Sequence, residues 1–466
     1  MFVGREKETE QLQNAVKVMN AATLIFGKRR VGKTTLIKHV LSQQQTAFVY
    51  YECLKGSIQE NIDGLTKEMQ NAGLIPVAPK FSSFQDLFAF LNTLSHPVIV
   101  VIDEYPYLKA VNDEKYVDST FQSVIDNSIR NVHLILSGSH IGIMKEMLEE
   151  NNALYGRFGT VIRLRELSYL AATAFYPALQ PYDKIWFYSV FGGSPFILTQ
   201  LCGTQSLKEN IIRTILNEHN PVYLYASNLL LSDYSRGMNA ERIFAVLGNG
   251  RKKYTEIEDK LNANKTGNLS KQLKQLIALE IIRRNAPINR LDDRKKVSYE
   301  INDNLMRFYY TYVYRNQSAL QMLGAEAFYE QYVAPTLSGF IAHRFEEICR
   351  DYFALKAQAG QLPGVRNIGS YYYTDPARKI NGEFDVALEY VDNYAIYEAK
   401  YYSVPMTLDE IHREVGQIRE IKELRIMHIG FVAASGFAER EEGYDYLTAA
   451  DLYSLDSKRE TALRQN

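Results

Sequence analysis

The sequence lacks the features that mark secreted or membrane-spanning proteins. Its 466 residues contain only three cysteines, Cys53, Cys202 and Cys349, which lie far apart and match no metal or disulfide spacing. The longest apolar runs, such as Pro97–Ile102, are far too short to cross a bilayer, and the polar start MFVGREKE has no signal-peptide core. We therefore expect reduced thiols and a soluble, cytoplasmic protein without a membrane partner.

An excess of one charge is also absent. The 53 Lys and Arg residues almost balance the 54 Asp and Glu residues, which leaves a formal net charge of −1. Any DNA contact must therefore come from a local basic patch. Hydrophobic residues make up 46% of the chain and charged residues 23%, which allows large cores and argues against wholesale disorder. The length suggests about three domains.

Short apolar runs alternate with amphipathic stretches in residues 1–160. The strand candidates are Ala22–Phe26, Ala47–Tyr51, Val98–Ile102 and Val132–Leu136. Near-continuous apolarity is typical of strands buried on both faces, as in a parallel sheet covered by helices. This pattern predicts an α/β fold.

Helical patterns dominate residues 161–235, which predicts a helical lid. Residues 236–330 show a different order: helices at Thr255–Leu261 and Leu269–Ile282, a charged hairpin at Arg290–Val297 and a strand at Val297–Ile301. Helix, turn, helix and hairpin in this order predict a winged-helix domain. Residues 331–466 return to α/β alternation, with strands expected at Phe384–Tyr390, Tyr394–Lys400 and Met427–Ala433.

The segment GKRRVGKT follows the first strand candidate and matches G-x-x-x-x-G-K-T. Gly27 and Gly32 let the backbone curl so that its N–H groups face phosphates. Lys33 supplies a point charge for the β- and γ-phosphates, and Thr34 supplies a hydroxyl ligand for Mg²⁺. The next helix directs its positive N-terminus at the same anion. The ATP-binding residues expected here are Gly27, Lys28, Arg29, Arg30, Val31, Gly32, Lys33, Thr34 and Thr35.

The strand candidate Val98–Ile102 ends in two carboxylates, Asp103 and Glu104. Asp103 could hold the Mg²⁺ of ATP, and Glu104 could orient or deprotonate the attacking water. The fourth strand candidate is followed by small hydroxyl residues, Ser137 and Ser139, a polar tip that could sense the γ-phosphate or simply cap the next helix. Arg157 could report nucleotide state or be an ordinary surface arginine.

These motifs, in this order, resemble the archaeal-type ATPases of the AAA+/STAND group. The match includes Phe2–Arg5, the phosphate loop, the Asp103-Glu104 pair and, later, Gly192–Pro195. The resemblance covers about 235 residues. It implies that Phe2–Arg5, with Gly4 and Arg5, borders the adenine pocket and that Pro195 in the lid approaches the nucleotide. Arg29 and Arg30 depart from the pattern by crowding the phosphate loop.

A second group of chemical residues lies near the C-terminus. Asp385 falls in one strand candidate, and Glu398 and Lys400 fall two residues apart in the next, so they share a face. If the strands are neighbours, the two carboxylates could hold Mg²⁺ or Mn²⁺, with Glu346 as a further ligand and Lys400 positioning water. An amphipathic hairpin with these residues on its solvent face would show the same pattern.

This second group resembles the PD-(D/E)XK nucleases, a domain often fused behind this ATPase family. The resemblance covers about residues 335–440 and implies a divalent-metal nuclease site at Asp385, Glu398 and Lys400. It departs from the motif at Phe384, which stands in place of the proline. Gln417 could correspond to a helical glutamine of some such nucleases.

Basic residues in the winged-helix segment could contact DNA. Such contacts would come from a recognition helix and from the phosphate-binding wing. The residues are Lys271, Lys274, Arg283, Arg284, Arg290, Arg294, Lys295 and Lys296. Asp292 and Asp293 dilute the charge of the wing, so a protein-binding module with a solvated face is an alternative.

Three hypotheses follow. The leading one is an ATP-binding and ATP-hydrolysing switch coupled to a nuclease-like, DNA-acting C-terminal domain. The second is an ATP-gated signalling scaffold that binds protein partners or itself, and the third is an ATP-gated transcription regulator, both without nuclease activity.

Overall fold

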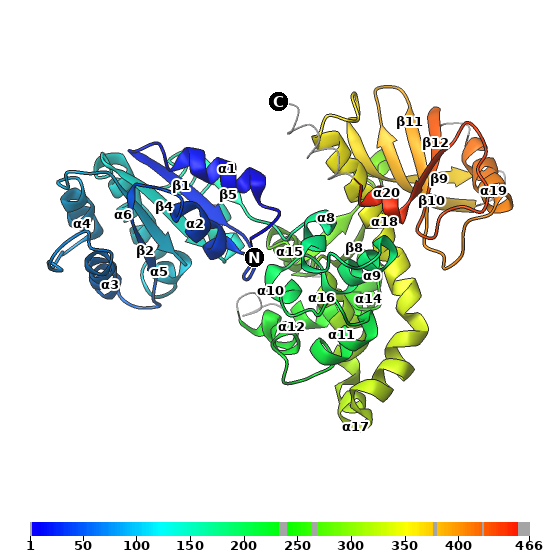
Figure 1. Ribbon diagram of the computed structural model, residues 1–466, viewed down its shortest axis with the longest axis horizontal. Coiled ribbons are helices and arrows are strands. Elements are labelled where there is room, and N and C mark those ends of the chain that lie inside the picture. The colour runs from blue at the N-terminus through cyan, green and yellow to red at the C-terminus, as the bar shows by residue number, and fades with distance from the viewer. Residues whose placement is uncertain (1, 233–239, 263–267, 376–379, 422–423, 455–466) are drawn as a thin grey trace. The chain divides into compact units, whose positions relative to one another are not determined.

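The computed structural model describes residues 2–232, 240–262, 268–375, 380–421 and 424–454. The chain divides into two compact units (Figure 1). The first contains residues 1–167 and 194–196, and the second contains residues 168–193 and 197–466.

A sheet of five parallel strands forms the centre of the first unit, in the order β2-β3-β4-β1-β5. The strands are β1 (Ala21–Phe26), β2 (Ala47–Glu52), β3 (Val98–Asp103), β4 (Val132–Gly138) and β5 (Thr160–Arg163). The four strands predicted from the sequence are confirmed. The sequence does not reveal β5, because only Ile162 of this edge strand is buried.

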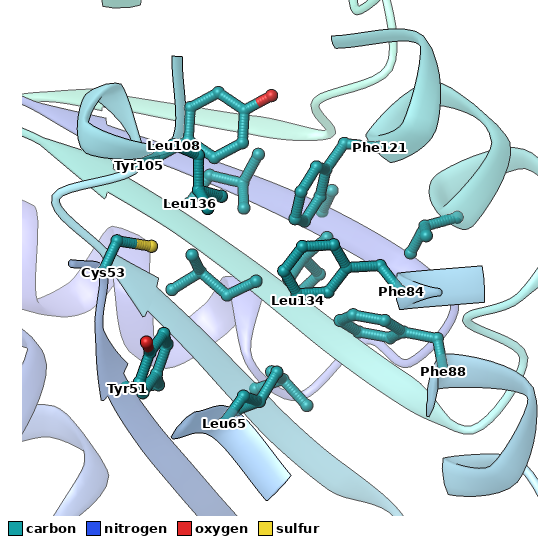
Figure 2. Close-up of a cluster of buried hydrophobic side chains, with 14 of the residues drawn as sticks. Tyr51, Cys53, Leu65, Phe84, Phe88, Tyr105, Leu108, Phe121, Leu134 and Leu136 are labelled. Carbon is teal, nitrogen blue, oxygen red and sulfur yellow. The ribbon is translucent and has the colours of Figure 1, made fainter. Parts of the chain in front are cut away.

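Both faces of this sheet are covered, as shown by alternate residues of an inner strand that pack into two different hydrophobic clusters. On β3, Val100 and Ile102 contribute to one cluster, whereas Ile99 and Val101 contribute to the other. Figure 2 shows part of the first cluster, with aromatic side chains around Leu134 of β4. The helices of this unit are α1 (Glu6–Ala15), α2 (Lys33–Leu41), α3 (Ile58–Asn71), α4 (Phe84–Leu91), α5 (Pro106–Val111), α6 (Glu114–Asn127) and α7 (Ile141–Glu146).

The second unit begins with helices. They are α8 (Tyr169–Ala172), α9 (Pro181–Phe191), α10 (Pro195–Leu198, whose first residues belong to the first unit), α11 (Leu207–Thr214) and α12 (Pro221–Ser232). The helical character predicted for residues 161–235 is therefore present over most of that segment. No helix among the described residues is long and apolar enough to cross a membrane.

A small antiparallel sheet, in the order β6-β8-β7, lies in the middle of the second unit. The elements here are α13 (Ala240–Leu247), β6 (Lys252–Lys253), α14 (Tyr254–Leu261), α15 (Asn268–Ala278), β7 (Ile282–Asn285) and β8 (Ser298–Ile301). The predicted helix Leu269–Ile282 is wrong at its C-terminal end. Glu280 has a φ of 61° and Ile281 N–H bonds back to Leu276, which ends the helix before β7.

A mixed five-stranded sheet, in the order β13-β12-β11-β10-β9, forms the C-terminal part. Its three strands β9 to β11 are antiparallel, and β12 and β13 continue parallel to β11. The strands are β9 (Asn367–Asp375), β10 (Ile380–Glu389), β11 (Tyr394–Lys400), β12 (Ile426–Ala433) and β13 (Asp445–Thr448). The accompanying helices are α16 (Asn304–Phe308), α17 (Gln317–Phe328), α18 (Ala334–Gln358), α19 (Leu408–Arg419) and α20 (Ala449–Leu452).

Candidate functional site

The chemical motifs of the first unit meet at one edge of its sheet. Because the strands are parallel, the loops after β1, β3 and β4 all leave the carboxyl edge. The loop after β1 has two glycines with different structural roles. A side-chain carbon on Gly27 would overlap the carbonyl oxygen of Leu164, and Gly32 has a φ of 96°. This loop therefore has the tight backbone that a phosphate cradle requires.

Lys33 begins α2 and reaches back across the loop. Its Nζ donates to the carbonyl oxygens of Gly27 and Lys28, both at 2.9 Å. Burial lowers the pKa of Lys33, while the charges of Glu104 and Asp103 oppose that shift. A buried cation held by carbonyls beside a helix N-terminus fits an anionic phosphate.

Asp103, which is 3% exposed, collects hydroxyl donors at the end of β3. Thr34 Oγ1 donates to Asp103 Oδ2 at 3.0 Å, and the hydroxyl of Tyr50 donates to the same oxygen. The other carboxylate oxygen, Oδ1, accepts the backbone N–H of Glu104 at 2.9 Å. An oxygen-rich pair such as Thr34 and Asp103 suits Mg²⁺.

Glu104 takes a left-handed backbone conformation, with a φ of 50°. Ser139, just beyond β4, holds its carboxylate with Oγ at 2.7 and 2.8 Å and with its backbone N–H at 3.2 Å. Ser137 is fully buried, and its Oγ has no hydrogen-bond partner among the described residues. The tip of β4 therefore orients Glu104 through Ser139, while the Ser137 hydroxyl is buried without a hydrogen-bond partner among the described residues.

The residues around the loop are held by their neighbours. Buried Arg5 donates to the carbonyl oxygens of Val31 (3.0 Å) and Arg165 (2.6 Å), and it follows Gly4, which has a φ of 65°. Arg5 thus supports the phosphate loop directly. Lys28 pairs with Glu166 at 3.4 Å. Thr35 is exposed in the first turn of α2.

The two additional arginines of the loop have partners in the first unit. Arg29 donates to the hydroxyl of Tyr107 at 2.9 Å. The guanidinium of Arg30 lies 3.7 Å from the ring centroid of Phe196, and its carbonyl accepts a hydrogen bond from Ser194 at 3.4 Å. Pro195 lies beside Gly32. The segment Ser194–Phe196 is therefore attached to the phosphate loop.

Arg157 lies elsewhere. It forms an ion pair with Asp126 at 2.9 Å, and it precedes β5 at the amino edge of the sheet, where Gly159 N–H bonds to the carbonyl of Ala22. The phosphate loop leaves the opposite, carboxyl edge. The structure therefore does not bring Arg157 to the loop of its own chain.

The second candidate site lies on neighbouring strands of the C-terminal sheet. The register pairs Val386 of β10 with Tyr397 of β11, which places Asp385 opposite Glu398. Asp385 Oδ2 accepts the backbone N–H of Ala399 at 3.0 Å, and Lys400 Nζ lies 3.1 Å from Glu398 Oε2 and 3.4 Å from Glu414. The structure therefore gathers Asp385, Glu398 and Lys400.

The electrostatics of these residues reflect their closeness. Burial and the charge of Glu346 raise the pKa of Asp385 to about 6. Burial and the charge of Asp385 also raise the pKa of Glu398. Burial opposes protonation of Lys400, but the charges of Glu398 and Asp385 raise its pKa overall. Two close carboxylates with a compensating cation could accept a divalent metal.

Glu346 does not complete a three-carboxylate site. It lies 3.4 Å from His343 and 3.9 Å from Arg350, and Arg350 also donates to the carbonyl oxygen of Asp385 at 2.7 Å. Across the described part of the chain, no three His, Cys, Asp or Glu residues gather as a metal site would require. Two carboxylates therefore remain, which is a number that Mg²⁺ accepts when water supplies other ligands.

Some basic residues around the small sheet are exposed, and others are bonded to residues of the same chain. Lys271 and Lys274 are exposed on α15, opposite its buried face. Arg283 instead pairs with Glu300 at 2.6 Å. Lys296 donates to the hydroxyl of Tyr372 on β9 at 2.6 Å and lies over its ring. The expected wing contact of Lys296 with phosphate is therefore replaced by an intramolecular contact.

The remaining basic residues of this segment differ in their environment. Arg284 is exposed, and it donates to the carbonyl oxygen of Leu291 at 2.6 Å. Arg290, Arg294 and Lys295 are also exposed. These residues, with Lys271 and Lys274, remain available to an external partner.

Comparison with known families agrees with the geometry of the first unit. Residues 2–201 match the model of a family described as an ATPase domain predominantly from Archaea. The chain therefore contains a P-loop ATPase domain. Residues 309–413 match a second family, described as archaeal and bacterial proteins of unknown function.

Individual relatives extend over most of this ATPase. It is 27% identical over 372 residues to the uncharacterized protein MJECL04 of Methanocaldococcus jannaschii, covering 78% of this chain and 80% of the relative. Its fold is similar to the Walker-type ATPase PABY2304 of Pyrococcus abyssi, with a TM-score of 0.52, 19% identity and coverage of 66% and 95% of the two chains. The ORC2 protein of Aeropyrum pernix matches with a TM-score of 0.45 and 12% identity, covering 68% and 94%.

Proposed function

We propose that this P-loop ATPase is a switch whose nucleotide state controls a nuclease-like C-terminal domain that acts on DNA. The observation that carries the proposal is the meeting of Asp385, Glu398 and Lys400 on two neighbouring strands of a unit separate from the ATPase core. Two neighbouring carboxylates are costly unless cations join them, so the pair of Asp385 and Glu398 beside the single ammonium of Lys400 supports a site that also takes a divalent cation.

In the ATPase site, Lys33 would contact the β- and γ-phosphates and give up its bonds to the loop carbonyls. Thr34 and Asp103 would hold the Mg²⁺ of ATP, which supplies positive charge beside the transferred phosphate. Glu104, fixed by Ser139, would orient the attacking water and accept its proton. The unpartnered hydroxyl of Ser137 would face the phosphate side of the sheet.

Glu104→Gln tests the division between binding and hydrolysis. The substitution removes the carboxylate but leaves the loop, Lys33 and Asp103 in place. We expect ATP to bind with unchanged affinity while turnover falls by about 10²–10⁴, the usual contribution of a general base. Calorimetry and a phosphate-release assay measure the two quantities. Glu114→Gln, an exposed carboxylate in α6, is the control, and wild-type turnover in Glu104→Gln would refute the assigned role.

In the C-terminal domain, Asp385 and Glu398 would bind the metal, and Lys400 would hold water or stabilise negative charge on the scissile phosphate. A divalent cation there would polarise the phosphodiester. Phe384 occupies the position of the motif's proline, and its ring is buried against Tyr373. The register of β10 with β9 shifts between Phe384 and Ala387. Such an irregularity can direct the Asp385 side chain toward β11.

The second unit also offers a route for control of this site. Tyr401 follows Lys400, and its ring stacks on Tyr182 of α9 at 5.3 Å and lies 6.4 Å from Trp186. The chain leaves α9 through Gly192 and Gly193 and enters Ser194–Phe196, the segment attached to the phosphate loop. Through this chain connection, the state of the loop could be passed to α9, whose Tyr182 contacts the ring of Tyr401 next to Lys400 in the sequence.

The small three-stranded sheet supports a winged-helix interpretation. Helix α13, strand β6, helices α14 and α15, and strands β7 and β8 follow in the order that such a domain uses. In this interpretation α15 is the recognition helix, with Lys271 and Lys274 on its exposed face. Duplex DNA is the partner that such a face fits.

A double substitution, Lys271→Ala with Lys274→Ala, tests the DNA interface. We expect weaker duplex binding and a salt slope lower by about 1 for each lysine that contacts phosphate. Lys296→Ala is the contrast, since Lys296 is already bonded to Tyr372 and should leave the slope unchanged. Fluorescence anisotropy across a salt series gives the slope. Equal slopes for all three proteins would remove α15 from the interface.

The alternative is an ATP-gated scaffold or transcription regulator without nuclease activity. The absence of a third metal-binding carboxylate among the described residues and the internal pairing of Lys296 and Arg283 favour it. Protein partners or self-association would then replace DNA cleavage as the output. A failure of the wild-type chain to bind duplex DNA at low salt would favour this alternative.

A further inference from the structure

Tyr50 lies where sequence motifs for ATP hydrolysis give no reason to expect a functional residue. It belongs to β2, whose neighbour β3 carries Asp103. Its hydroxyl donates to Asp103 Oδ2 and lies 3.5 Å from Thr34 Oγ1. Both residues proposed to hold the Mg²⁺ of ATP are therefore within reach of one phenol group.

The strand itself directs this contact. Successive residues of β2 point to opposite faces. Tyr51 packs in the cluster beneath α3 and donates to buried Asn61 at 3.0 Å, whereas Tyr50 packs with the cluster that includes α2. Lys38 of α2 lies over the Tyr50 ring, 4.9 Å from its centroid. The ring is thus held between β2 and α2 with its hydroxyl directed at Asp103.

We propose that Tyr50 is a positioning residue that orients Asp103 for Mg²⁺ in the ATPase site. The two carboxylate oxygens of Asp103 accept hydrogen bonds from three donors. The N–H of Glu104 donates to Oδ1, and the hydroxyls of Thr34 and Tyr50 both donate to Oδ2. Tyr50 donates from β2, whereas Thr34 donates from α2 and Glu104 follows β3, so the Tyr50 bond adds an independent restraint on the rotation of the Asp103 carboxylate. This inference rests on the metal-holding role proposed above for Thr34 and Asp103.

The bond from Tyr50 should matter for the metal more than for the nucleotide. Phosphate contacts come from the backbone of the loop and from Lys33, whereas the loop residue that the Tyr50 hydroxyl approaches is Thr34, through the side chain proposed to hold the metal. A hydrogen bond to a charged group typically changes an equilibrium by about tenfold or more. Loss of the hydroxyl should therefore raise the Mg²⁺ concentration needed for tight nucleotide binding and leave Mg²⁺-free binding intact.

The test is Tyr50→Phe in the full chain, with Tyr51→Phe as the matched control on the same strand. Binding of a fluorescent ATP analogue is titrated in EDTA and then against Mg²⁺. For Tyr50→Phe we expect unchanged affinity in EDTA and a Mg²⁺ half-saturation about tenfold higher than wild type. For Tyr51→Phe neither quantity should change, although its loss of the Asn61 bond can lower the melting temperature.

Two results would overturn the inference. One is a Mg²⁺ half-saturation in Tyr50→Phe equal to wild type. The other is an equal loss of affinity with and without Mg²⁺, which would mean that Tyr50 only supports the fold of the pocket. Asp103→Asn separates this failure from failure of the proposed site. If Asp103→Asn keeps the wild-type Mg²⁺ dependence, the metal-holding role itself is wrong.

Discussion

Replacing Lys33 with alanine is expected to lower ATP affinity at least about a hundredfold, since two or more charge-assisted hydrogen bonds to phosphate are lost. Lys33 is the buried cation at the start of α2, and its Nζ spans the loop to reach Gly27 and Lys28. Alanine leaves the helix N-terminus and the glycines intact, so the loss should appear in binding rather than folding. Calorimetry with ATP and Mg²⁺ measures the effect.

Lys17→Ala is the control for this experiment. Lys17 is exposed beyond the end of α1, where it bonds only to Asn14 among the contacts described. The Lys17→Ala protein should bind ATP with the affinity of the wild type. Wild-type affinity in Lys33→Ala would refute the phosphate-loop assignment and with it the ATPase site built around Thr34 and Asp103.

The second large effect is expected for Lys400→Ala. The ammonium lies 3.1 Å from Glu398 and compensates a carboxylate pair that burial makes unfavourable. We expect cleavage of DNA with Mg²⁺ or Mn²⁺ to fall by about 10²–10³, as when a preorganised charge-stabilising donor is removed. ATP hydrolysis should be unaffected, because the ATPase residues all lie in the other unit. Gel-based cleavage and phosphate release report the two activities.

Lys356→Ala serves as the control, since Lys356 lies near the end of α18 and contacts the ring of Tyr352 rather than the carboxylates. The Lys356→Ala protein should cleave DNA at the rate of the wild type. If Lys400→Ala cleaved as fast as the control, the C-terminal site would lose its central cation. Wild-type protein that binds DNA but never cleaves it would support a binding role for the nuclease-like domain.

Sequence patterns predicted the parts of this protein whose signals are local. The strands β1 to β4 are continuous apolar runs, because both faces of the sheet are covered. The phosphate loop contains its two glycines and Lys33 within eight consecutive residues. The sequence analysis gave the pairing of β10 with β11 as a condition of the second site, and the register meets it by bringing Asp385 opposite Glu398.

Features that depend on distant partners were not accessible from the sequence. The edge strand β5 buries only Ile162, so it has little apolar pattern. Tyr50 contacts Asp103 from the neighbouring strand β2, a contact that the sequence does not indicate. Ser139 was visible as part of a polar strand tip, but its bond to Glu104 was not. Arg157 and Lys296 are basic residues whose acceptors, Asp126 and Tyr372, lie far away in sequence.

Cleavage of duplex DNA by the full chain, with and without ATP, tests the central claim most directly. The account predicts that ATP changes the Mg²⁺-dependent cleavage rate of the wild type. It also predicts that ATP does not change the cleavage rate of Lys33→Ala, and that Lys400→Ala does not cleave DNA with or without ATP. A wild-type cleavage rate that is the same with and without ATP would contradict the proposed control of the C-terminal domain by the nucleotide.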